Sequence, residues 1–189
     1  MQDIINEYIG GLKLGRKQSY KNLTVFALLS DYAANADYLT LDEALSGDLI
    51  DVVEKDEDGT VPELKVVNKS DRMVLILDGE ELVGAKQNRI VNTTVLIAGN
   101  TTTVIPVSCV EEGRWSYKSD KLYSEKRMMS SKLRASEADQ VRYSLGNSGK
   151  FRSNQAEIWN DVEELAFDLD AASPSMAMAA IYQKEAPTI

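Results

Sequence analysis

The 189-residue chain contains no histidine, and this absence excludes more chemistry than any other feature of its composition. Without histidine there is no His-ligated zinc site, no Ser–His or Cys–His catalytic pair, and no side chain with an ordinary pKa near neutrality. Any catalysis must therefore use carboxylates, lysine, tyrosine, the single thiol, or an ion held by oxygen ligands.

Cysteine and long apolar runs are also scarce. Cys109 is the one cysteine, which excludes an intramolecular disulfide and suits a reducing compartment. The N-terminus carries acids where a signal peptide needs basic residues. No apolar run reaches the roughly 18 residues that a membrane helix requires. We expect a cytoplasmic protein that does not associate with membranes.

Positive charge is in deficit. The chain has 21 Lys plus Arg against 30 Asp plus Glu, giving a net charge of −9. Such a chain repels nucleic-acid backbones and anionic membranes unless it gathers its cations locally. We therefore expect no nucleic-acid partner.

The middle of the chain has the pattern of a β-meander. Short apolar segments alternate with turn sequences such as Asp58-Gly59, Asp78-Gly79 and Gly99-Asn100, which supply the positive-φ positions of tight turns. This spacing predicts a mainly antiparallel meander over about residues 49–111. Its last two strands are expected at 90–97 and 101–110.

The flanking regions contain mostly helical signals. Apolar residues at helical spacing predict a helix at 4–9, and Thr40 with Glu43 forms a capping-box pattern before a helix at 41–46. The segment LTVFALL at 23–29 is predicted to be a buried strand.

The sequence after Trp115 turns helical. A weak helical period runs through 122–145, a second capping-box pattern spans 154–157, and a packed helix is expected after Pro174. The fold class predicted is α+β with helices at the N-terminus and in the C-terminal part. We expect a single domain over residues 1–189, with a β-rich part at about 20–115 and a helical part at about 120–185.

One predicted strand is interrupted by four long polar side chains. In GEELVGAKQNRIVNTT they are Lys86, Gln87, Asn88 and Arg89. Such a run is typical of a solvated loop, but it also suits a binding site. Lysine and arginine neutralise phosphate or carboxylate, and amides, including that of Asn92, match sugar hydroxyls or a base edge.

A second polar cluster follows in the next strand. Pro106 cannot donate a ladder hydrogen bond, so it implies a sheet edge or a bulge. The hairpin partner of this strand leads out of residues 86–89, which brings the two clusters toward the same end of the sheet. Arg114 adds a third cation, and Trp115 offers a stacking surface or a core side chain.

Three glutamates and the thiol are the candidates for chemistry. Glu80, Glu81 and Glu111 can accept from hydroxyls, act as general acid or base, or hold a magnesium ion. Cys109 is either a small buried residue or a nucleophile, and as a nucleophile it needs Lys86 or Arg89 nearby to lower its pKa.

These two clusters carry a resemblance. The stretches GEELVGAKQNRIVNTT and VIPVSCVEEGRW resemble the core of the ARG and rhodanese-phosphatase-superfamily-associated domain family. The similarity extends to Leu133-Arg134 and to Gln155 with Trp159, and it covers roughly residues 70–165. The family is named for its gene association with ADP-ribosylglycohydrolases and phosphatases. This association implies a role in processing or sensing ADP-ribose or another NAD-derived nucleotide.

Three functions follow as expectations. The first is a hydrolase acting on an ADP-ribose-like nucleotide, with Glu111 and Glu81 as acid and base and Lys86, Arg89 and Arg114 neutralising phosphate. The second is a module that binds the same small anionic ligand without turning it over. The third is a protein-interaction scaffold built on the C-terminal helices, whose methionines favour adaptable packing. Cofactor requirement and oligomeric state are left open by the sequence.

Overall fold

The computed structural model describes residues 2–32, 37–56, 59–171 and 173–186. The chain divides into two compact units, residues 1–36 and 37–189. The single domain expected over 1–189 stays a prediction, because this division reflects contacts and not independent folding.

The first unit is a helix followed by a β-hairpin. Helix α1 spans Gln2–Gly10, and strands β1 (Lys13–Tyr20) and β2 (Leu23–Leu29) pair antiparallel. The helix and the strand at 23–29 were both predicted, whereas β1 was not. Strand β2 was predicted to be buried, but within this unit every one of its residues is exposed.

The second unit is built around a β-barrel. Among the described residues, six strands close in the order β10-β5-β4-β11-β7-β8, and the pairs are antiparallel. The strands are β4 (Ile50–Glu54), β5 (Glu63–Asn68), β7 (Glu80–Gly84), β8 (Arg89–Val91), β10 (Thr102–Cys109) and β11 (Leu122–Met128). The alternating burial along β4 and β5 shows why this sequence suits a barrel, since every second side chain points into the interior.

A small second sheet and a short helix adjoin the barrel. Strands β3 (Tyr38–Thr40), β6 (Met73–Ile76) and β9 (Val95–Ile97) form this sheet, in which β3 and β6 run parallel and β9 is antiparallel to β6. Helix α2 (Leu41–Ser46) begins with the predicted capping box, because the Thr40 and Glu43 side chains each accept from the other's backbone amide.

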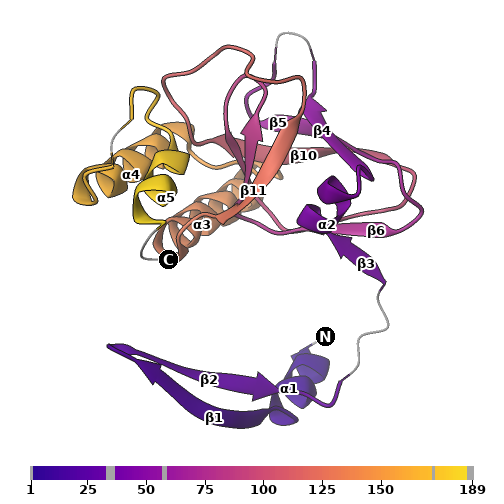
Figure 1. The fold of residues 1–189 in the computed structure, drawn as a ribbon. Coiled ribbons are helices and arrows are strands. Elements are labelled where there is room, and N and C mark those ends of the chain that lie inside the picture. Colours follow the sequence, from indigo (N-terminus) through magenta and orange to yellow (C-terminus); the bar gives the residue numbers. More distant parts are fainter. Residues whose placement is uncertain (1, 33–36, 57–58, 172, 187–189) are drawn as a thin grey trace. The chain divides into compact units, whose positions relative to one another are not determined.

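Three helices gather on one side of the barrel, away from α2 (Figure 1). They are α3 (Ser131–Ser148), α4 (Gln155–Asp168) and α5 (Met178–Glu185). Helix α3 ends at Gly149, whose φ of 68° is the left-handed conformation that glycine adopts readily. The helix predicted after 154–157 is present, but its capping box is wrong, since the Asn154 side chain makes no capping hydrogen bond.

Two apolar cores result from this arrangement. One fills the barrel, and the other lies between the barrel and the three C-terminal helices. Strand β10 leads from one core to the other, because Ile105 and Val107 point into the barrel while Val110, directly after the strand, packs among the helices. The end of β10 is therefore buried on both faces.

The α+β class and the mostly antiparallel strands are confirmed, but some segments differ from the prediction. Residues 122–128 form strand β11 instead of helix, because their backbone pairs with β7 and so closes the barrel. The strand expected at 90–97 is two strands in different sheets, β8 and β9. Pro106 lies in the closed barrel, where the partner of β10 changes from β5 to β8 and a missing donor is tolerated.

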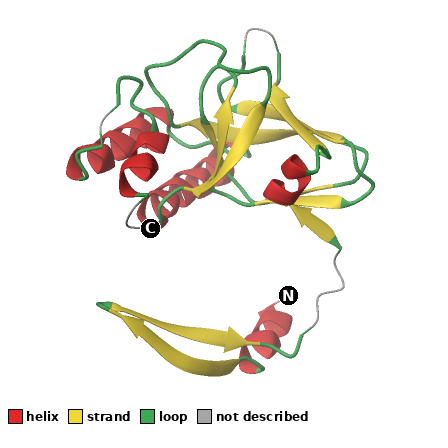
Figure 2. Cartoon of the chain, in the orientation of Figure 1, coloured by secondary structure: helices red, strands yellow, loops and turns green. Residues whose placement is uncertain are grey.

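The connection from β10 to β11 is long and runs as loop, coloured green in Figure 2. It carries Arg114, Trp115 and Lys118 and lies beside the turn between β7 and β8, because the Lys118 amide donates to the Ala85 carbonyl at 2.9 Å. Across the described ranges, no helix has both the length and the apolar character needed to cross a membrane.

Truncation of a barrel side chain tests the fold. Leu82 on β7 is fully buried in the barrel core, so Leu82→Ala should lower the free energy of unfolding by about 2–5 kcal/mol. Leu96→Ala, on the exposed side of β9, should change it by only about 0.5 kcal/mol. Denaturant titrations of both variants measure the difference, and equal losses would contradict the barrel core.

Candidate functional site

The polar run at 86–89 lies in and after the turn between β7 and β8, and most of it is buried. Gln87 and Asn88 are each 4% exposed, and Arg89 is completely buried. The run is therefore not a solvated loop. Buried polar groups require partners, and the geometry of those partners defines the site.

Gln87 and Arg89 of this run fill one end of the barrel. Together with Glu54 and Cys109 they form what we call the barrel-end group. Arg89 and Val91 lie on the same face of β8, and Val91 belongs to the barrel core. The Arg89 guanidinium therefore points into the barrel, where Nη2 lies 3.9 Å from Glu54 Oε1. Arg89 Nη1 donates to Gln87 Oε1 at 3.2 Å. The Glu54 carboxylate is thus the counter-charge of this cation, but Arg89 Nε and Nη2 make no hydrogen bond among the described residues.

Cys109 belongs to the same barrel-end group. Its thiol is buried and donates to Gln87 Oε1 at 2.9 Å. Burial raises the pKa of the Cys109 thiol to about 11, and the nearby Arg89 offsets this only in part. The thiol is protonated at neutral pH, so this environment favours a structural role over a nucleophilic one.

Trp115 closes the barrel end from outside. Its ring centre lies 5.7 Å from the Arg89 guanidinium and 5.4 Å from Lys86 Nζ. Lys86 Nζ also lies 5.1 Å from the Tyr117 ring, and the Lys86 amide donates to Glu54 Oε1 at 3.2 Å. Lys86 and Trp115 therefore stack on each other, which stabilises the cation through the ring faces.

Glu111 and Arg114 form the central ion pair. Glu111 Oε2 accepts from Arg114 Nη2 at 2.7 Å, from Arg114 Nε at 2.9 Å and from the Asn88 amide at 3.1 Å. Burial alone would raise the pKa of Glu111, but the hydrogen bonds from Arg114, Asn88 and Ser175 outweigh it and lower the pKa below its usual value. Glu111 is ionised at neutral pH.

Arg114 also holds the turn that carries the polar run. It donates to the carbonyl oxygens of Ala85 at 2.6 Å and Gly84 at 3.2 Å, and to Asn88 Oδ1 at 3.1 Å. Ala85 adopts a φ of 40°, a conformation that costs energy for a residue with a Cβ. The hydrogen bonds from Arg114 stabilise this strained turn.

Gln155 anchors the end of β10 to helix α4. Its side-chain oxygen accepts from the Cys109 amide, and its side-chain nitrogen donates to the Cys109 carbonyl, both at 2.8 Å. The Gln155 side chain thus makes the backbone hydrogen bonds that a neighbouring strand would make at the end of β10. The sequence pointed to Gln155 through the resemblance, but the spacing of residues gave no sign of this contact.

A small pocket lies between this network and the C-terminal helices. We call it the helix-side pocket; its volume is about 180 Å³. The barrel side contributes Asn88, Glu111 and Arg127, and the C-terminal part contributes Ser175 and Gln183. Lys118 and Glu125 complete its charged lining. The pocket is therefore polar and carries charges of both signs.

Glu81 lies directly behind this pocket. Glu81 lies on the same face of β7 as Val83, and Val83 lines the pocket. Arg127 Nη1 lies 3.7 Å from Glu81 Oε2. Glu81 is fully buried, and among the described residues only Asn88 and Arg127 approach its carboxylate oxygens, neither with the geometry of a good hydrogen bond. Burial raises the pKa of Glu81 to about 7, although Arg127 acts in the opposite direction.

Two residues of the predicted site lie outside this network. Glu80 Oε2 accepts from the Leu77 amide at 2.8 Å at the start of β7. Asn92 accepts from the Ser108 hydroxyl at 2.8 Å and donates to the Phe151 carbonyl at 3.1 Å. Both side chains hold the fold locally and do not line the helix-side pocket.

The structure also places residues in the site that sequence reasoning did not select. They are Glu54, Lys118, Glu125, Arg127, Ser175 and Gln183. Glu125 and Arg127 were assigned to a helix, so their approach to Glu81 on the neighbouring strand β7 could not be foreseen. As for metals, the described residues include no group of three or more Cys, Asp or Glu placed to hold an ion.

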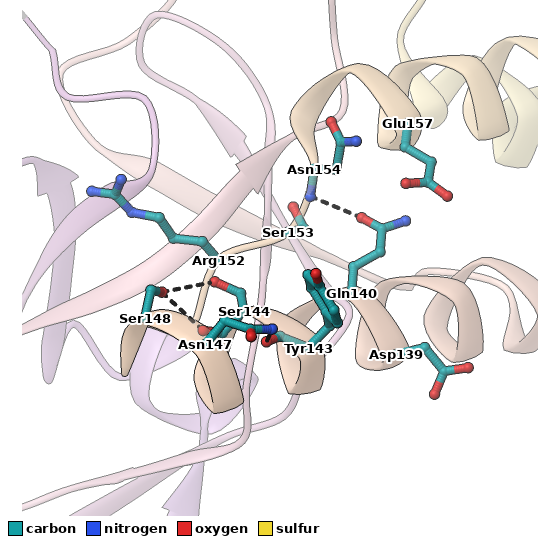
Figure 3. Close-up of a pocket in the computed structure, with 10 residues that line it drawn as sticks. All are labelled: Asp139, Gln140, Tyr143, Ser144, Asn147, Ser148, Arg152, Ser153, Asn154 and Glu157. Carbon is teal, nitrogen blue, oxygen red and sulfur yellow. Dashed lines mark hydrogen bonds between the residues drawn. The ribbon is translucent and has the colours of Figure 1, made fainter.

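A larger cavity, of about 650 Å³, has none of these residues in its lining (Figure 3). It is bounded by helix α3 and by residues 152–157. Gln140 accepts from the Asn154 amide across it at 2.9 Å, and Tyr143 stands beside them. None of its lining residues was predicted as functional, and most are exposed. We therefore do not assign the candidate site to this cavity.

Fold and site together define an α+β protein in which a closed barrel carries a buried, histidine-free polar network beside a small pocket. The chain belongs to the ARG and Rhodanese-Phosphatase-superfamily-associated Protein domain family, whose model matches residues 11–189. The resemblance inferred from the two polar clusters is thereby confirmed, over a longer stretch than expected. A search of curated proteins and a search of solved structures found no match.

The state of Cys109 can be tested with a thiol reagent. Because the thiol is buried and has a raised pKa, the native chain should react with an aromatic disulfide at least about 100-fold more slowly at pH 7–8 than the chain in denaturant. Absorbance of the released thiolate measures both rates. Equal rates would show that Cys109 is accessible.

The raised pKa of Glu81 predicts a pH-dependent stability. Between its ordinary pKa of 4.5 and about 7, the carboxyl ionises in the unfolded chain but stays protonated in the native one. This difference lowers the stability as the pH rises, by about 3 kcal/mol at most. Glu81→Gln removes the loss, so its advantage over the wild type should grow from pH 4.5 to 7 and then level off. Glu164→Gln removes a charge from exposed surface and serves as the control in the same denaturant titrations.

Proposed function

We propose that the helix-side pocket binds the ribose–phosphate end of a small nucleotide of the ADP-ribose type. The observation that carries the proposal is the convergence of Lys118, Arg127 and Asn88 on one small polar pocket beside Glu111. Cations suit a phosphate group, and amide and hydroxyl side chains suit the ribose.

Arg127 is the strongest single support for an anionic ligand. Its side chain is 18% exposed, and its Nη1 contacts the Glu125 carboxylate and lies 3.7 Å from Glu81 Oε2, without a hydrogen bond of good geometry to either. A phosphate oxygen entering the pocket would offer this nitrogen an acceptor in better alignment, in competition with the Glu125 carboxylate. Arginine also binds phosphate through two parallel hydrogen bonds.

The pocket volume limits how much of a ligand can enter. Pockets that enclose a whole drug-sized molecule measure roughly 300–1,000 Å³, whereas this pocket measures about 180 Å³. Only one end of a dinucleotide fits, so the remainder of an ADP-ribose-like ligand would lie on the surface outside. The proposal therefore concerns the sugar–phosphate group and not the base.

Binding without turnover is the function that the geometry favours. Glu111 is engaged by Arg114 and by the Asn88 amide, and Cys109 is buried with a raised pKa. Neither is an uncommitted nucleophile or base. The scaffold function has less support, because Met178 of the C-terminal segment is fully buried against the other helices.

Hydrolysis is the second candidate, and Glu81 is the specific observation in its favour. The environments of Glu81 and Glu111 shift their pKa values in opposite directions, which is the usual way that two carboxyls divide acid and base roles. Glu81 would give its proton to a leaving oxygen, and Glu111 would accept one from the attacking water. Both roles require a ligand that opens the pocket to Glu81.

A thermal-shift series with phosphate, ribose 5-phosphate, AMP and ADP-ribose tests the proposal. A ligand at about 100 times its dissociation constant stabilises the native chain by about 2.7 kcal/mol. We expect such a shift in the wild type and its loss in Arg127→Gln. Arg152→Gln, at the larger cavity, is the matched control and should keep the full shift.

Three outcomes separate the alternatives. No shift with any of the four compounds would contradict nucleotide binding, and loss of the shift in Arg152→Gln alone would move the site to the larger cavity. Product formation from ADP-ribose that disappears in Glu81→Gln, with binding retained, would establish hydrolysis in place of binding alone.

A further inference from the structure

The guanidinium of Arg127 lies between two carboxyl groups. Its Nη1 contacts the Glu125 carboxylate and lies 3.7 Å from Glu81 Oε2. Arg127 and Glu125 line the helix-side pocket, whereas Glu81 is fully buried behind it. A ligand that reaches this guanidinium therefore changes the electrostatic surroundings of Glu81 even where it does not contact Glu81.

Three further groups lie near Glu81 on neighbouring elements. Glu111, after β10, is ionised and adds a negative charge, while the Asn88 side chain approaches from the turn between β7 and β8. Burial raises the pKa of Tyr182 on α5, and the nearby Glu81 adds to this rise. None of these three groups brings a positive charge to Glu81.

The charges around the pocket leave a positive excess only when Glu81 is protonated. The Glu111 carboxylate is already neutralised by its own arginine. Two cations, Lys118 and Arg127, remain in the lining. With Glu81 ionised, its charge and that of Glu125 balance them, whereas with Glu81 protonated one positive charge is in excess. The protonated form is thus the one that suits an anionic ligand.

We propose that an anionic group enters the helix-side pocket together with a proton, which Glu81 takes up from solvent. This inference rests on the nucleotide proposal above and names the regulation of that same site. An anion on Arg127 uses the cation that balances Glu81, and it brings a second negative charge close to the carboxylate, which disfavours the ionised form. Anion and proton therefore bind cooperatively, and each strengthens the binding of the other by the same factor.

The coupling gives the site a defined pH dependence. Burial is the main cause that brings the pKa of Glu81 to about 7 in the free protein, and the bound anion raises this pKa further. At about pH 6 the carboxyl is protonated in both states, so the affinity hardly depends on pH. Above pH 7 the free protein loses a proton that the complex keeps. The affinity should therefore fall, by about tenfold between pH 6 and pH 8.

Calorimetric titration of the full chain with ADP-ribose tests the coupling. The two phosphates of its pyrophosphate each carry one charge that does not titrate near neutrality, so an exchanged proton belongs to the protein. Titrations at pH 7 in two buffers of different ionisation enthalpy count the protons. We expect the wild type to take up about 0.5 proton per ligand, because Glu81 is half protonated in the free protein and fully protonated in the complex.

Two variants assign the proton to its residue. Glu81→Gln keeps the shape of the carboxyl but carries no charge, so its proton uptake should be near zero and its affinity constant between about pH 6 and pH 8. Glu164→Gln makes the same chemical change on the exposed surface of α4. This control should keep the proton uptake and the pH dependence of the wild type.

The outcomes separate this inference from the proposal on which it rests. Binding of ADP-ribose to the wild type without proton uptake would overturn the inference and leave nucleotide binding in place. Undiminished uptake in Glu81→Gln would also overturn it, because the proton would then go to another group. Absence of binding at every pH would overturn both.

Discussion

The site depends on one ion pair, that of Glu111 with Arg114. This arginine binds the carboxylate with two of its nitrogens, and it also donates to the carbonyl groups of the β7–β8 turn. The turn needs this support, since Ala85 adopts a positive φ within it. Because the same turn carries Gln87, Asn88 and Arg89, the Arg114 guanidinium also fixes the backbone from which these polar side chains project. Buried ion pairs stabilise little by themselves, so the pair matters here through the geometry that it imposes.

The polar run serves two different surroundings. Arg89 and Gln87 point to the barrel end, where Glu54 and Trp115 lie beside the guanidinium, whereas Asn88 faces the helix-side pocket. The run of four polar residues therefore partly fills the end of the barrel and partly lines a pocket. The strands of a barrel separate inner from outer side chains, so neighbours in sequence can face opposite environments.

The carboxyl groups show how chemistry near pH 7 can be arranged without histidine. Desolvation is the main cause that raises the pKa of Glu81 to about 7, with the nearby carboxylates of Glu125 and Glu111 acting in the same direction, while hydrogen bonds keep Glu111 ionised. The two residues differ in burial and partners, not in type. The Glu81 carboxyl makes no hydrogen bond of good geometry among the described residues, so protonation is the way in which this buried group avoids an exposed charge in an apolar setting.

The sequence by itself determined the local elements and the set of polar residues. Helix α2 follows from the Thr40–Glu43 capping box, and the two clusters at 86–89 and 106–115 were visible together with their hairpin relation. Tertiary structure alone decided the rest. Residues 122–128 look helical locally but become a strand, because closing the barrel between β4 and β7 outweighs a weak periodicity. Likewise, Arg127 and Lys118 meet Asn88 only because that closure brings distant segments together, and no spacing along the chain encodes such a contact.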